Sequence, residues 1–108
     1  FRAIIGLDMV KILMTWDIKP GREQEYFEFM VREWVPGIQR LGIEPTDAWY
    51  TQHGNSPQIL SGGTARDLGA MRKILATDDW HSLKEQLLGL VDNYQERLVR
   101  ARSGFQML

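Results

Sequence analysis

The stretch from Met9 to Phe27, MVKILMTWDIKPGREQEYF, decides the fold because it contains a strand, a turn and the start of a helix in direct succession. Apolar side chains occupy every second position, which is the period of a strand, at Val10, Ile12, Met14, Trp16 and Ile18. Pro20-Gly21 is a turn dipeptide, and two glutamates then lie in the first turn of the expected helix, where carboxylates favour the helix dipole. The stretch therefore predicts a strand over 9–18 followed by a helix.

The helix is expected to run from about Arg22 to Leu41 and to end at Gly42 in a left-handed conformation. Pro36 lies inside it and removes a backbone donor, so we expect a kink near 32–35. Its apolar face is predicted to consist of residues at helical spacing: Phe27, Met30, Val31, Trp34, Ile38 and Leu41.

Two further strands are expected at about 46–53 and 58–65, joined by a hairpin through the turn-rich segment 53–57. Gly62-Gly63 predicts a bulge or a close backbone approach in the third strand. Asp67 is expected to cap a short helix to about Leu75, and Thr77 a second helix with a buried stripe of Trp80, Leu83, Leu87, Leu90, Val91 and Tyr94. A fourth strand is placed within 95–107 because β-α-β-β-α needs a final strand, although 95–102 also fits a continuing helix.

The composition limits the possible functions of this 108-residue chain. Its length fits one domain, predicted to span 9–108, with 1–8 as an extension outside the fold. The absence of cysteine excludes disulfides, thiolate metal sites and a cysteine nucleophile. A net charge of -1 without a basic stripe gives no basis for binding nucleic acid, and no apolar run is long enough for a membrane span. A cytoplasmic location is the default expectation.

The region from Met9 to Met107 resembles the dimeric α+β barrel superfamily of ferredoxin-like folds, which includes antibiotic-biosynthesis-monooxygenase-like, EthD-like and NIPSNAP-like proteins. The resemblance rests on the strand that ends in Lys19-Pro20-Gly21, the kinked helix that closes with Leu41-Gly42, the hairpin at 54–57 and the broken second helix. It implies an α+β fold with a four-stranded antiparallel sheet in βαββαβ order, and a homodimer in which two such sheets face each other. It also implies a small apolar ligand, and in some members haem, between sheet and helices.

The expected ligand-binding residues are aromatic or lie near the end of the second strand: Trp16, Trp49, Tyr50, Thr51, His53 and Trp80. Trp49, Thr51 and His53 share one face of that strand, so an apolar wall, a hydroxyl and an imidazole come together there. Any ligand is therefore expected to lie against Trp49 and near His53.

The candidate catalytic residues are His53, Asp17 and His81. His53 is either a base or haem ligand or a solvated histidine beside a turn. Asp17 either lies in the pocket with a pKa raised by desolvation, or pairs with Lys11 or Lys19. His81 and Glu85 have a spacing that can share a metal, but without a third ligand a solvated pair is expected, and no metal site is predicted.

The sequence thus predicts a small-molecule-binding dimer without a complete catalytic constellation, and leaves open whether the protein is an enzyme. The alternative is a monooxygenase-like or haem-dependent enzyme acting on a small hydrophobic substrate. Haem-degrading members of the superfamily use an Asn on the first strand, a Trp and a helical His. Trp16-Asp17 stand near that position here, and the two asparagines of the chain are Asn55 and Asn93, so haem chemistry is not the favoured hypothesis.

Overall fold

The computed structural model describes residues 9–51 and 57–101. The chain forms four strands, four α-helices and one π-helical segment within these ranges. In order they are β1 (Met9–Ile18), α1 (Glu23–Phe29), η2 (Met30–Trp34), α2 (Val35–Leu41), β2 (Glu44–Tyr50), β3 (Ile59–Ala65), α3 (Leu68–Leu75), α4 (Asp78–Leu88) and β4 (Val91–Ala101).

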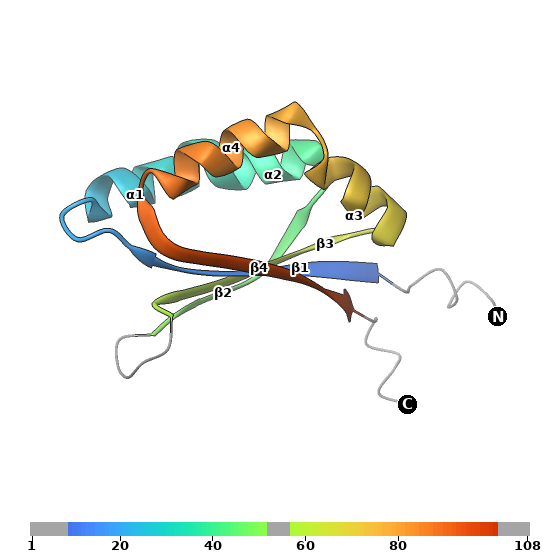
Figure 1. The fold of residues 1–108 in the computed structure, drawn as a ribbon, viewed down its shortest axis with the longest axis horizontal. Helices are drawn as coiled ribbons and strands as arrows, with labels where there is room; N and C mark the ends of the chain where they lie inside the picture. The colour runs from blue at the N-terminus through green and yellow to red at the C-terminus, as the bar shows by residue number, and fades with distance from the viewer. Residues whose placement is uncertain (1–8, 52–56, 102–108) are drawn as a thin grey trace.

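The four strands form one antiparallel sheet in the order β2-β3-β1-β4, and all helices lie on one face of it (Figure 1). The two central strands, β1 and β3, are the first and third along the chain, as in a ferredoxin-like fold. The predicted fold class is therefore confirmed, including the final strand, although β4 begins four residues before the predicted window. Helix α4 ends at Leu88, so the predicted helical stripe was wrong beyond that point: Val91 and Tyr94 belong to β4.

The core lies between the sheet and the helices because the alternation of β1 sends every second side chain toward the helix layer. Ile12, Met14 and Trp16 are fully buried there, and the intervening residues are only partly buried on the opposite face. Trp34 and Trp80 meet these side chains from the helix layer. The capping predictions are confirmed as well: the Asp67 carboxylate accepts from the backbone N–H of Ala70, and the Thr77 hydroxyl from that of Trp80.

The predicted kink in the first helix is a π-helical segment, η2, which ends one residue before α2 and two before Pro36. A π turn contains one more residue than an α turn, so it offsets the apolar face on its two sides. The residue of α1 on the same face as Trp34 is therefore Tyr26, eight positions earlier, and not Phe27, seven positions earlier. The predicted face was accordingly wrong at Phe27 and Val31, which are 53% and 73% exposed.

The prediction of a close approach at Gly62-Gly63 is confirmed. A Cβ built on Gly63 would lie 2.5 Å from Cγ2 of Ile43, so no larger residue fits there without movement. The bulge falls on the neighbouring strand, where the register of β2 shifts between Pro45 and Asp47. Gly42 ends α2 with φ 105°, the left-handed conformation expected of it. These glycines thus fix how β2 leaves the helix layer and joins the sheet.

Candidate ligand-binding site

An apolar pocket of about 400 Å³ opens between β2 and β3 on one side and the continuous helix α1–η2–α2 on the other. Its inner wall contains three buried aromatic residues, Trp16, Tyr26 and Trp34. Its mouth is surrounded by side chains of a different kind, which are large, apolar and exposed to solvent: Phe27, Val35 and Tyr50. The pocket therefore joins the aromatic core to the surface.

Trp16 is fixed at the centre of the inner wall. Its indole Nε1–H donates to the Tyr26 hydroxyl at 2.9 Å, and its ring meets those of Tyr26 and Trp34 edge-on, with centroids 6.4 Å and 6.0 Å away. Tyr94 stacks on it in nearly parallel orientation, at 5.9 Å. Such aromatic pairs stabilise a particular ring orientation in addition to burying area, so the inner wall has a defined shape.

Tyr94 is itself held by an ionic network from α4. Its hydroxyl donates to Glu96 at 2.7 Å, Glu96 pairs with Lys84 at 3.0 Å, and the Lys84 ammonium lies 4.9 Å from the centre of the Tyr94 ring. Burial raises the pKa of Tyr94, and the neighbouring Glu96 carboxylate raises it further. Tyr94 thus remains a neutral support for Trp16.

Burial raises the pKa of Tyr26 to about 12, while the hydrogen bond from Trp16 acts in the opposite direction. The Tyr26 hydroxyl therefore stays protonated in the physiological range. It can donate a hydrogen bond into the pocket, but it is a poor general base.

The polar groups at the outer wall are few. The Asp47 carboxylate is bound to Lys11 Nζ at 2.6 Å on the opposite face of the sheet, and the Tyr50 hydroxyl accepts from the Gln58 side-chain amide at 3.4 Å. Ser61 faces the helices, since it is paired in register with the buried Met14. The pocket thus has an apolar lining with hydroxyls at a small number of points.

Of the residues predicted to bind a ligand, Trp16, Trp49 and Tyr50 line this pocket. Trp80 is buried behind Trp34, with ring centroids 5.7 Å apart, and Thr51 is exposed beyond the end of β2. His53 lies outside the described residues. Their roles in binding stay a prediction.

Tyr26 and Trp34 line the pocket but were not among the predicted site residues. Both belong to the helix that faces β2, and their spacing of eight residues signals a shared face only once the π turn is known. Tyr26 was also left out of the predicted apolar face.

Both hypotheses for Asp17 were wrong. Its carboxylate accepts from the Gln58 backbone N–H at 2.8 Å and from the Asn93 side-chain amide at 2.9 Å. The Asn93 bond first, and the Gln58 bond second, lower the pKa of Asp17 instead of raising it. Lys11 pairs with Asp47, and Lys19 lies 3.9 Å from Asp92. Asp17 therefore ties three strand ends together on the sheet face away from the pocket.

His81 and Glu85 are both exposed on α4. Across the described ranges, no cluster of three His, Asp or Glu side chains could hold a metal ion. The same part of the chain contains no helix with the length and hydropathy needed to cross a bilayer.

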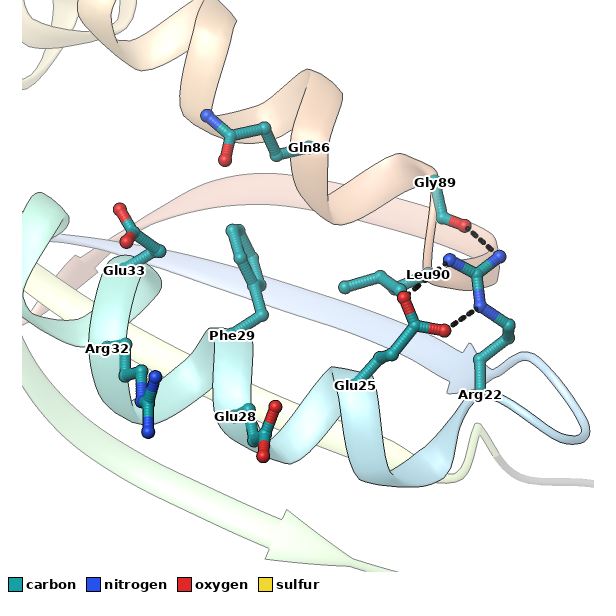
Figure 2. A pocket seen from close by; sticks show the side chains of 9 residues that line it. All are labelled: Arg22, Glu25, Glu28, Phe29, Arg32, Glu33, Gln86, Gly89 and Leu90. Atoms are coloured by element: carbon teal, nitrogen blue, oxygen red, sulfur yellow. Dashed lines mark hydrogen bonds and ion pairs between the residues drawn. The ribbon is translucent and has the colours of Figure 1, made fainter.

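A second hollow, of about 410 Å³, lies between α1–η2 and the end of α4 (Figure 2). Two of its charged groups are already engaged: the Arg22 guanidinium binds the Glu25 carboxylate at 2.6 Å and the Gly89 carbonyl at 3.4 Å. Only Phe29 and Leu90 give it apolar surface, and the glutamates along its edge are exposed. The aromatic pocket is the better candidate because it combines similar volume with a buried wall.

No protein-family model matches this sequence, and a search of curated proteins finds no relative. Solved structures do resemble it. An uncharacterized NIPSNAP-like domain protein from Burkholderia xenovorans has 18% identity and a TM-score of 0.66, over 90% of this chain and 88% of that one. A NIPSNAP family protein from Agrobacterium tumefaciens has 19% identity and a TM-score of 0.68, over 90% and 95%.

SnoaB, a cofactor-independent oxygenase from Streptomyces nogalater, has 16% identity and a TM-score of 0.66, over 89% of this chain and 95% of that one. Similarity at this level establishes the fold. This chain therefore has the ferredoxin-like α+β fold of NIPSNAP-like and monooxygenase-like proteins, as the resemblance implied.

Proposed function

We propose that this protein binds a small, uncharged and largely apolar molecule in the aromatic pocket, and that it does so as a homodimer. The observation that carries the proposal is the mouth of the pocket, where Phe27 is 53% and Tyr50 55% exposed directly beside a buried aromatic wall. Large apolar side chains grouped at the surface around a concave site are typical of ligand-binding proteins.

Binding is favoured over catalysis by the ionisable groups of the pocket. Asp47 is neutralised by Lys11, and Tyr26 keeps its proton. The described lining contains no histidine or lysine that could act as a base at neutral pH. It also offers no histidine or cysteine to an iron, and His81 lies outside the pocket, so these residues do not fit haem.

The proposal is tested with N-phenyl-1-naphthylamine, a neutral dye whose fluorescence rises in apolar surroundings. Val35 and Val31 provide a matched pair, because both are exposed on the same helical layer but only Val35 lines the pocket. Val35→Lys places an ammonium at the mouth and should weaken dye binding about tenfold or more, since an apolar site disfavours an unpaired charge. Val31→Lys should bind as the wild type does.

Two results would contradict ligand binding in this pocket. One is wild-type protein that does not bind the dye at all. The other is an equal loss of affinity in the two lysine variants, which would mean that the dye sits on the helix surface.

The dimer is proposed to form through the sheet face that the helices leave open (Figure 1). The register places Thr15 between Leu60 and Gln95 on that face, with Trp49 next to Leu60. Leu60 is 36% exposed, and Leu13 lies partly buried beside it on β1. A sheet face with apolar residues at its centre is stabilised when a second sheet packs against it.

Light scattering tests the dimer, with Leu60→Glu compared against Leu68→Glu. Leu68 has a similar exposure, 39%, but lies on α3. The wild type and Leu68→Glu should have the mass of a dimer at micromolar concentration, and Leu60→Glu should have that of a monomer because a charge facing its symmetry mate is desolvated. A monomeric wild type would contradict this part of the proposal.

The second candidate function is oxidation of an electron-rich aromatic molecule by dioxygen without a bound cofactor. It is favoured by the likeness to SnoaB together with a pocket walled by Trp16 and Trp34. Oxygen uptake with 1-naphthol as a probe tests it, with Val35→Lys as the blocked control. Uptake that is the same in both proteins, or equal to the rate without protein, would count against this candidate.

A further inference from the structure

The Tyr26 hydroxyl is a buried polar group that makes one hydrogen bond, as an acceptor, and can still donate another. Its side chain is 3% exposed and lines the pocket. The hydroxyl oxygen accepts from Trp16 at 2.9 Å, and its own proton has no acceptor within 9–51 and 57–101. Buried polar groups are almost always paired in native proteins, so a donor without an acceptor needs an explanation.

Trp16 determines whether the Tyr26 hydroxyl remains available as a donor or as an acceptor. An indole N–H can only donate, so the tyrosine oxygen must serve as the acceptor in this pair. The O–H bond is then left free to donate in another direction. Trp16 is in turn fixed by Tyr94 and Trp34, which leaves the two partners little freedom to rearrange.

We infer that the ligand carries an uncharged carbonyl oxygen that accepts a hydrogen bond from Tyr26, and that Trp16 acts as the positioning residue for this contact. The inference rests on the proposed ligand pocket and specifies the chemical class of its occupant: a flat, apolar molecule with a ketone, aldehyde or quinone oxygen on its inner edge.

An anionic acceptor fits the site less well than a neutral one. Asp47 is the one charged residue of the described lining, and its carboxylate is bound to Lys11 on the other face of the sheet, so the lining offers no cationic partner to an anion. Moving a carboxylate from water into an apolar wall without a cationic partner is strongly unfavourable. A carbonyl oxygen accepts the same hydrogen bond at a much smaller desolvation cost.

The inference predicts discrimination between two molecules that differ only in that oxygen. A site built to hydrogen-bond a polar group rejects the analogue that lacks it, because the buried partner is then left unpaired. We therefore compare 1-tetralone with tetralin, its hydrocarbon counterpart, each competing with N-phenyl-1-naphthylamine. The two probes have the same ring skeleton, so they differ little in shape.

Tyr26→Phe should weaken the binding of 1-tetralone about tenfold and leave that of tetralin within about twofold, since one net hydrogen bond is lost. Ser82→Ala is the control: it removes a hydroxyl exposed on α4, outside the pocket, and should change neither affinity. Trp16→Phe keeps the tyrosine but releases its orientation, so it should reduce the preference for 1-tetralone less than Tyr26→Phe does.

A measurement on the wild type keeps the inference testable if Tyr26→Phe does not fold. Hydrogen bonds in a chain polarise one another, so a carbonyl bound to Tyr26 should move the NMR signal of the Trp16 indole proton downfield. Tetralin in the same pocket should move it less. The competition experiment distinguishes failure of the carbonyl inference from failure of the proposed pocket.

If the probes displace the dye but Tyr26→Phe affects both equally, or if the wild type prefers neither, the carbonyl inference is overturned and the pocket stands. If neither probe nor dye binds the wild type, the proposed function itself fails.

Discussion

Replacing Trp16 by Phe should destabilise the protein more than the same replacement at Trp80. Both tryptophans are 1% exposed, so burial alone predicts equal effects. Their surroundings differ, however. Trp16 makes three ring contacts and donates a hydrogen bond to Tyr26. Trp80 makes one ring contact, with Trp34, and no hydrogen bond of its indole N–H is found in the described part of the chain.

The expected difference follows from these contacts. The lost hydrogen bond contributes about 1 kcal/mol, and aromatic pairs contribute about 0.5–1.5 kcal/mol each, of which a phenyl ring retains a part. Trp16→Phe should therefore lower the free energy of unfolding by about 1–2 kcal/mol more than Trp80→Phe. For a domain of this size each kcal/mol corresponds to about 4–8 °C in Tm.

Thermal unfolding followed by far-UV circular dichroism measures this difference without depending on tryptophan fluorescence. The variants are compared at one protein concentration, because the proposed dimerisation would couple stability to concentration. Dye binding gives a second readout, which should weaken in Trp16→Phe and persist in Trp80→Phe. If Trp80→Phe proved the less stable of the two, the view of Trp16 as the organising residue of the pocket wall would be refuted.

Further variants test other parts of the structure. Gly63→Ala should lower stability by about 1–3 kcal/mol, because its Cβ would lie 2.5 Å from Ile43. Gly62→Ala should cost under about 1 kcal/mol, because its nearest new neighbour, the Thr46 hydroxyl, would be 3.2 Å away; equal urea midpoints would contradict this. Gly42→Ala should cost about 1 kcal/mol, since φ there is 105°; an unchanged Tm would argue against the left-handed cap. Asp17→Asn should be less stable than the wild type at neutral pH but lose less stability on acidification. The folded-state pKa of Asp17 is lowered, so its contribution is present above the ordinary carboxyl pKa and disappears as the pH falls through the folded-state value; parallel pH profiles for the two proteins would exclude that role.

The strands were predictable because their signal is local. In β1 the alternation of apolar residues continues for ten positions and matches the burial pattern residue by residue. The cap residues Asp67 and Thr77 were predictable for the same reason, since each acts three residues away. The first helix was only partly predictable: Pro36 signals a disruption, but the residues do not specify that a π turn adds one position. Because of that one extra position, Tyr26 is the buried residue of α1 and Phe27 is exposed.

The site was predictable only where it coincides with a strand. Trp16 follows from the alternation of β1, but its hydrogen bond to Tyr26 depends on the π turn. The partners of Asp17 lie 41 and 76 residues away along the chain, and no local pattern indicates them. From charge alone, Lys11 and Lys19 were expected to pair with Asp17. The sheet register instead places Lys11 beside Asp47, and those two side chains form the ion pair.

The central claim, that a ligand occupies the aromatic pocket, is tested most directly by the indole N–H signals of the four tryptophans in a ¹⁵N-labelled sample titrated with N-phenyl-1-naphthylamine. Trp16, Trp34 and Trp49 line the pocket, and Trp80 does not. The signals of Trp16 and Trp34, the two buried tryptophans of the lining, should shift together with saturation while that of Trp80 changes little. A titration in which Trp80 shifts most, or in which only the exposed Trp49 responds, would contradict the claim.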